Sequence, residues 1–228
     1  MERYIFLGVL LFSLIALGIG MLLPGKSVQE AEPYLPWQIE KTAKGSSRVF
    51  GLELGTSTLL EAQNRFRELY EVSMFARDDG DKVVEVYFDS ITLSGLRARV
   101  VLVMELTPEQ LNGFYERGVR IATLGSGGRK VTLDDVDLLS LASMPIASLT
   151  YIPKSQLSAE LVQARFGTPA ERIREKDSES LVEHWLYPDY GLDLILHEKG
   201  KEVLQYTQPG RFDSLRKPLI EQGGIIVN

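Results

Sequence analysis

The chain has 228 residues, of which 44% are hydrophobic and 25% are charged, and its formal net charge is −6. This composition supplies a hydrophobic core and excludes wholesale disorder. The acidic balance argues against nucleic acid as the main partner, because phosphate binding needs a concentrated basic surface. The chain has no cysteine, which excludes disulfides, thiolate metal sites, a cysteine nucleophile and a lipid-modified N-terminal cysteine.

The first predicted element is a membrane-anchoring helix within residues 1–24. From Ile5 to Leu23 every residue except Ser13 is apolar or glycine, and Pro24 with Gly25 ends the run. A helix rises about 1.5 Å per residue, so a run of roughly 19 residues approaches the hydrocarbon thickness of a bilayer. The anchor residues that we expect to contact lipid are Ile5, Leu10, Phe12, Ile15 and Leu22.

A cleaved signal peptide is the alternative interpretation of this segment. Signal peptides have an apolar stretch of about 7–15 residues before a small-x-small cleavage site. The run here is longer, and the best downstream site, at residues 29–31, has glutamine at the −3 position. Arg3 precedes the run, whereas Lys26 is soon joined by Glu30 and Glu32, so the positive-inside tendency favours a cytoplasmic N-terminus and an exported soluble part.

Residues 25–47 are predicted to be a linker, because prolines and charges occur there without periodicity. Trp37 and Tyr34 form an aromatic pair within it. A position at the membrane interface and docking onto the soluble domain both remain open for this pair.

Two similar segments indicate an internal repeat. Leu59–Phe66 and Ala159–Phe166 share the pattern Gln-x-Arg-Phe, and each follows a hydroxyl residue that can cap a helix, Thr58 or Ser158. Glu61 completes a capping-box pattern in the first copy. Both segments are therefore predicted to be helices.

Strand patterns follow each predicted helix. Apolar residues alternate from Leu96 to Leu106 and from Leu192 to His197, and Lys199-Gly200 predicts a turn into a last strand at Glu202–Tyr206. We therefore predict an α+β fold: an N-terminal transmembrane helix followed by two tandem helix-plus-antiparallel-sheet repeats. The predicted repeats are residues 48–146 and residues 147–228, the second including a C-terminal tail.

Four shorter elements complete the prediction. They are a helix capped by Thr107 and ended by Gly118, a helix after Thr132 that stops before Pro145, a hairpin loop at 125–128, and a short helix over 212–221.

The second copy resembles a known family. Phe166-Gly167-Thr168-Pro169 closes a short helix, and Trp185–Leu192 is followed by a Lys-Gly turn and a strand. This order is similar to the SmpA/OmlA (BamE-like) envelope domains, whose fold is similar to one repeat of the β-lactamase inhibitor protein. The resemblance implies a non-catalytic, protein-binding domain of the bacterial envelope. Those proteins are typically lipoproteins with an N-terminal cysteine, which this chain lacks.

Few residues indicate chemistry. His184 and His197 have no partner at metal-ligand spacing and are interpreted as solvated or rim residues. The glycines before Arg129 and Lys130 do not have P-loop spacing, and the acids near Asp134 suit the first turn of a helix. We therefore predict no catalytic residue, no cofactor and no metal. The candidate interface residues are Trp185, Tyr187, Asp189 and Tyr190, because aromatic residues are enriched in binding hot spots. Core packing is the alternative for Tyr187 and Tyr190, and it is the favoured one for Trp185.

These observations predict an accessory or assembly subunit of a bacterial envelope or membrane complex that is not an enzyme. We expect it in the inner membrane, with a single pass and a periplasmic soluble domain, and with other membrane or envelope proteins as partners. One alternative is an inhibitor-like module that sequesters a soluble protein. A second is an enzyme with an unrecognised carboxylate site, which would place two buried carboxylates of perturbed pKa in a cleft.

Overall fold

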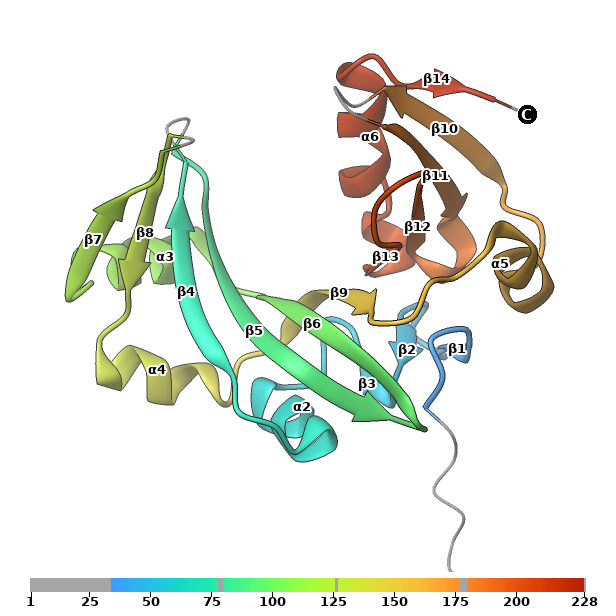
Figure 1. The fold of residues 1–228 in the computed structure, drawn as a ribbon. Coiled ribbons are helices and arrows are strands. Elements are labelled where there is room, and N and C mark those ends of the chain that lie inside the picture. The colour runs from blue at the N-terminus through green and yellow to red at the C-terminus, as the bar shows by residue number, and fades with distance from the viewer. Residues whose placement is uncertain (1–33, 78–79, 126, 177–179, 228) are drawn as a thin grey trace, which may run out of the picture. The chain divides into compact units, whose positions relative to one another are not determined.

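The computed structural model describes residues 34–77, 80–125, 127–176 and 180–227 (Figure 1). The described residues belong to one compact unit that begins at Tyr34. The predicted membrane helix lies outside the described residues, together with its anchor residues Ile5, Leu10, Phe12, Ile15 and Leu22. Within the described ranges, no helix is long and apolar enough to cross a membrane.

A large antiparallel sheet of eleven strands dominates the fold. In chain order the strands are β4 (Glu71–Ala76), β5 (Lys82–Leu93), β6 (Leu96–Met104), β7 (Arg120–Thr123), β8 (Arg129–Thr132), β9 (Ile146–Pro153), β10 (Glu171–Lys176), β11 (Leu181–Tyr187), β12 (Leu192–His197), β13 (Val203–Tyr206) and β14 (Ile225–Ile226). Their order across the sheet is β14-β10-β11-β12-β13-β9-β6-β5-β4-β8-β7. A separate small sheet contains β1 (Ile39–Lys41), β2 (Ser47–Val49) and β3 (Leu52–Glu53).

The predicted fold class is wrong. Instead of two tandem helix-plus-sheet repeats, the described chain is mostly one antiparallel sheet with a few short helices. The reason is β9, a strand that the sequence patterns did not reveal. It pairs with β6 along one edge and with β13 along the other, so strands of both predicted repeats join a single sheet.

Local helix signals are confirmed. The helices are α2 (Leu59–Phe66), α3 (Pro108–Glu116), α4 (Asp135–Leu141), α5 (Ala159–Phe166) and α6 (Asp213–Glu221), and two 3-10 turns are η1 (Pro188–Tyr190) and η2 (Pro209–Arg211). The Thr58 hydroxyl accepts a hydrogen bond from the Glu61 N–H at 3.3 Å, and the Glu61 carboxylate accepts one from the Thr58 N–H at 2.9 Å. This capping box satisfies two donors that the first helical turn leaves free.

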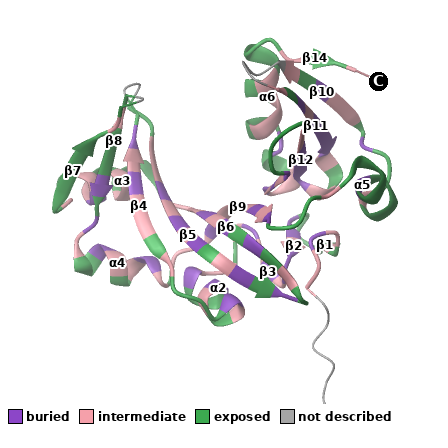
Figure 2. Cartoon of the chain, in the orientation of Figure 1, coloured by how far each residue is buried: buried purple, intermediate pink, exposed green. Residues whose placement is uncertain are grey.

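The main core lies on one face of the large sheet (Figure 2). Helices α2, α3 and α5 contribute Phe66, Phe114 and Val162 to it. The opposite face of the sheet is covered by α6 and by the residue before it. Here Phe212, Leu215 and Leu219 pack against Ile173 and Leu186. Strand β12 is therefore covered from both sides, and its first four residues are all buried.

The segment that follows Pro33 packs on the large sheet. The Tyr206 hydroxyl donates a buried hydrogen bond of 2.9 Å to the carbonyl oxygen of Pro36. The ring of Trp37 meets that of Phe166 edge-on, with centroids 6.5 Å apart, and the Arg65 guanidinium lies 4.1 Å from the centroid of Tyr34. Of the two positions left open for this aromatic pair, the structure shows docking onto the domain.

Candidate functional site

Two of the four predicted interface residues are part of the core. Trp185 and Tyr187 are each only 4% exposed. The Trp185 indole N–H donates to Glu183 at 2.7 Å, and the Arg172 guanidinium lies 4.0 Å from the ring centroid. The Tyr187 hydroxyl donates to the carbonyl of Gly167 at 3.0 Å. These contacts give both side chains a packing role.

The other two predicted residues, Asp189 and Tyr190, connect η1 to the small sheet. Asp189 is exposed and lies 3.2 Å from the ammonium of Lys41, which also faces the Tyr190 ring at 5.5 Å. The Ser47 hydroxyl donates to the Tyr190 carbonyl at 2.7 Å. An exposed ion pair of this kind contributes about 0–1 kcal/mol. A role of these residues in partner binding stays a prediction.

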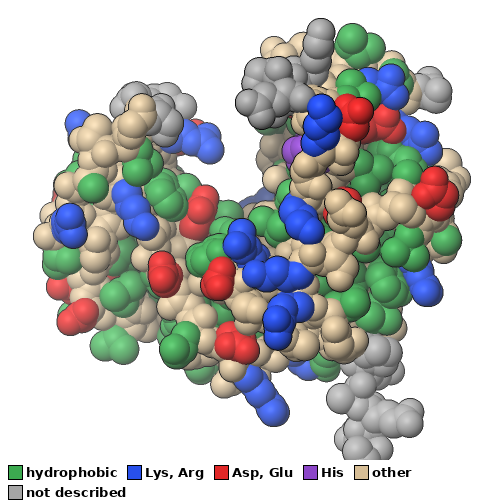
Figure 3. Space-filling view, viewed as in Figure 1, with side chains coloured by type: hydrophobic (Ala, Val, Ile, Leu, Met, Phe, Trp, Pro, Cys, Tyr) green, Lys and Arg blue, Asp and Glu red, His purple; other side chains and the backbone are tan. Residues whose placement is uncertain are grey.

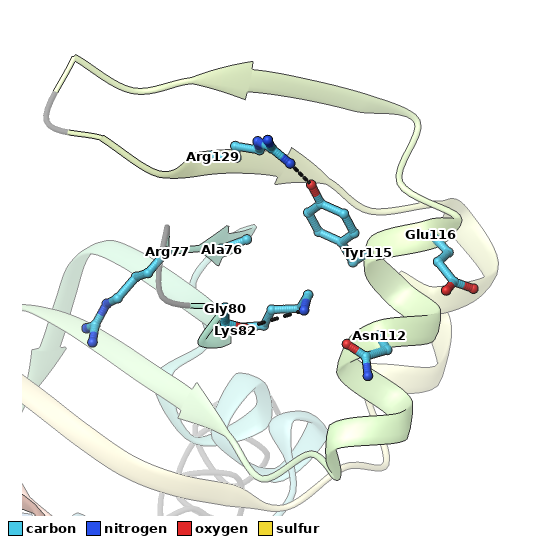
Figure 4. A pocket seen from close by; sticks show the side chains of 8 residues that line it. All are labelled: Ala76, Arg77, Gly80, Lys82, Asn112, Tyr115, Glu116 and Arg129. Atoms are coloured by element: carbon cyan, nitrogen blue, oxygen red, sulfur yellow. Dashed lines mark hydrogen bonds between the residues drawn. The ribbon is translucent and has the colours of Figure 1, made fainter.

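A pocket of about 460 Å³ opens between α3 and the ends of β4, β5 and β8 (Figure 4). Arg129 and Lys82 converge on Tyr115 there, whereas Arg77 points away. The Arg129 guanidinium donates to the Tyr115 hydroxyl at 2.6 Å, and the Lys82 ammonium lies 5.4 Å from the ring centroid. Both cations thus contact Tyr115. The neighbouring strands β7 and β8 pair as an antiparallel hairpin, as predicted for the glycines at 125–128.

A buried histidine–aspartate pair lies between β11 and β12. The Nδ1 atom of His184 is 2.8 Å from Oδ2 and 3.1 Å from Oδ1 of Asp193, and these residues are 5% and 1% exposed. In the strand register His184 is opposite Ile195 and Asp193 is opposite Leu186, so the pair is diagonal on one face. Burial raises the pKa of Asp193, while the hydrogen bond from His184 acts in the opposite direction.

A pocket of about 530 Å³ lies beside this pair. It is lined by Glu175, Val182, His184, Ile195, His197 and the turn at 222–224. The Nε2 atom of His184 is 3.9 Å from Oε2 of Glu175, which is beyond hydrogen-bonding distance. The other carboxylate oxygen of Glu175, Oε1, is buried without a hydrogen-bond partner in the described part of the chain.

The interpretation of His184 as a solvated or rim residue is wrong. That interpretation depended on the lack of a partner at metal-ligand spacing, whereas the partner of His184, Asp193, is nine residues away, on the neighbouring strand. The residues that cover this face come from 212–221, far along the chain. A signal was nevertheless present, because the strand reads Leu-Asp-Leu-Ile-Leu-His, and a nearly continuous apolar run is typical of a strand buried on both faces.

Large apolar side chains are exposed on α2, on α4, and on β7 with the residue just before it; Figure 3 shows the hydrophobic side chains on this view of the surface. We call these residues the apolar ridge; with their exposed fractions they are Leu60 (50%), Val119 (65%), Ile121 (49%), Val136 (72%) and Leu139 (78%). Val136 and Leu139 are three residues apart, so they share one side of α4.

Backbone and side-chain hydrogen bonds connect the elements of the apolar ridge. The N–H of Leu60 donates to the carbonyl of Ala142, just past the end of α4, at 2.9 Å. The guanidinium of Arg117, two residues before Val119, holds Asp137 of α4 with two bonds of 2.7 and 3.0 Å. Strand β7 is the terminal strand at this end of the sheet, and all four of its residues are exposed.

Comparisons with protein-family models, with curated proteins and with solved structures find no match for this chain. A function is therefore argued from its own residues.

Proposed function

We propose that the chain is a non-catalytic protein-binding module whose partner docks on the apolar ridge and along the free edge of β7. The observation that supports this proposal is the ridge itself, where five large apolar side chains are about half or more exposed on adjacent elements. Single exposed apolar residues are common on soluble proteins, but several on neighbouring elements favour an interaction site.

The chemistry of this surface suits a protein partner. Fully burying a leucine or valine side chain contributes about 1.5–3 kcal/mol, so covering the remaining exposed area of Val136 and Leu139 contributes part of that amount for each. The sum over the ridge offsets part of the cost of association. Strand β7 has β8 on one side and no strand on the other within the described residues. An extended partner segment with alternating apolar residues can add to this edge by main-chain hydrogen bonds.

The setting of this module is a further part of the proposal. The family resemblance supports an accessory or assembly role in a bacterial envelope or membrane complex, with other envelope proteins as partners. The sequestering alternative would instead use the sheet face opposite the main core, where half-buried Tyr87, Val101 and Thr150 lie on β5, β6 and β9. This face carries fewer strongly exposed apolar residues than the ridge.

Site-specific photocrosslinking tests the proposed surface. A photoreactive amino acid replaces Ile121 in β7, and crosslinking is carried out in cells with three backgrounds: unchanged, Leu139→Arg and Ile225→Arg. Ile225 is the matched control, because it is 67% exposed on β14 at the opposite edge of the sheet.

We expect one crosslinked protein in the unchanged and Ile225→Arg backgrounds, and a loss of about tenfold or more with Leu139→Arg, which corresponds to 1.4 kcal/mol or more. Circular dichroism and thermal unfolding of both variants check that the fold is retained. Equal crosslinking in all three backgrounds, or equal loss in both variants, would show that the ridge is not the docking surface.

A further inference from the structure

We propose that the pocket beside His184 binds a primary ammonium group carried on an aliphatic chain, as in a lysine side chain or a free alkylamine. This site is separate from the apolar ridge and does not depend on the partner proposed there.

The polar wall of the pocket presents hydrogen-bond acceptors. Nδ1 of His184 lies 2.8 Å from Oδ2 of Asp193, and its Nε2 lies 3.9 Å from Oε2 of Glu175; in the proposed complex the ring donates from Nδ1 to Asp193 and accepts through Nε2. Glu175 contributes Oε2, and its buried Oε1 has no hydrogen-bond partner among the described residues. A buried polar atom without a partner is unfavourable, so the carboxylate of Glu175 favours a positively charged donor beside it.

The spacing and charge of these acceptors fit an ammonium group. A donor nitrogen about 2.9 Å from each acceptor can be placed between Nε2 of His184 and Oε2 of Glu175, which are 3.9 Å apart. The three N–H donors of an ammonium nitrogen can serve Oε2 of Glu175, Nε2 of His184 and a water molecule in the pocket. The carboxylates of Glu175 and Asp193 also favour a positive charge in the pocket.

The remaining wall suits an aliphatic chain. Val182 and Ile195 are apolar and line the pocket between the polar groups and the turn at 222–224. A volume of about 530 Å³ accommodates a pentylammonium chain with space for water. A metal ion fits less well, because no group of three His, Cys, Asp or Glu residues within the described ranges is arranged to hold one.

Ligand titration followed by NMR tests the site in the full chain. Pentylammonium is the probe, and pentan-1-ol is its neutral counterpart of the same length. The imidazole resonances of His184 report on binding, and the indole resonance of Trp185 checks that the fold is unchanged. Glu175→Gln removes the proposed acceptor charge, whereas Glu198→Gln removes an equal charge at an exposed position that does not line the pocket.

We expect saturable shifts of the His184 resonances with pentylammonium and not with pentanol. Glu175→Gln should weaken binding about tenfold or more, as for loss of a charged hydrogen bond, and Glu198→Gln should change it less than about twofold. Equal binding of the alcohol, no effect of Glu175→Gln, or an equal effect of both variants would overturn the proposal. Zn²⁺ is added as a competitor. If it shifts the imidazole resonances of both His184 and His197 at a lower concentration than pentylammonium requires, the pocket is a metal site instead.

Two sources of the ammonium group are distinguished by a second ligand. If N-acetyl-lysine methylamide binds about tenfold more tightly than pentylammonium, the natural occupant is a lysine side chain of a peptide. Binding no tighter than that of pentylammonium would identify a free amine. Both results support an ammonium site.

Discussion

The hydrogen bond between Tyr206 and Pro36 ties the N-terminal segment to the large sheet, and Tyr206→Phe removes it. Proline has no N–H, so its carbonyl is the only main-chain hydrogen-bonding group of Pro36. Pro36 and Tyr206 are both buried, so water does not readily replace the lost donor. The phenylalanine ring keeps the edge-on contact with Phe50, whose centroid is 6.0 Å away. We expect a loss of about 1–2 kcal/mol in the free energy of unfolding.

Urea denaturation followed by tryptophan fluorescence measures this loss. The chain has two tryptophans, and Trp37 is adjacent to Pro36, so local detachment of this segment is visible before global unfolding. Tyr151→Phe is the matched control. Tyr151 is 1% exposed and stacks on Phe50 at 5.0 Å, but its hydroxyl makes no hydrogen bond within the described ranges. If both variants lose the same stability, the contribution assigned to the Pro36 bond is refuted.

Two further predictions concern charge and pH. Arg117→Ala should destabilise the fold more than Asp137→Ala, because the Asp137 side chain is 6% exposed and would be left without its partner, whereas Arg117 is 55% exposed and can be solvated; equal losses in urea denaturation would contradict this. Burial raises the pKa of Tyr206 well above its usual value of 10, so the neutral hydroxyl favours the folded state. This contribution to the free energy of unfolding is complete below pH 10 and is lost as the pH rises above 10. Above pH 10 the unchanged protein should therefore lose stability faster than Tyr206→Phe, by up to about 1.4 kcal/mol per pH unit, and parallel stability curves for the two proteins would refute the assignment.

The helices were predictable because their signals are local. The capping box of Thr58 and Glu61 involves residues three apart, and Thr107 with Pro108 defines the start of α3 in the same way. Strand β9 was not predicted. Its alternation is irregular at the start, where the register with β6 shifts, and its neighbours in the sheet lie about 45 to 55 residues away in the chain. Such pairing is decided by tertiary packing, which overrides local propensity.

The two proposed sites differ in how far the sequence reveals them. In α4, Val136, Leu138, Leu139 and Leu141 occur on more than one side of the helix, so the pattern does not show which of them face the core. The structure buries Leu141 and leaves Val136 and Leu139 exposed. The contact of His184 with Asp193 depends on the register of a hairpin and on coverage by a distant helix. Neither property is contained in the spacing of the two residues.

The seam between β9 and β13 has mechanical consequences. Three residue pairs join these strands, whereas β9 and β6 share seven, so the sheet is held much less strongly on one side of β9 than on the other. A force applied across β9, from β6 to β13, should therefore separate β13 first, at Leu149, Thr150 and Tyr151, and leave β9 paired with β6.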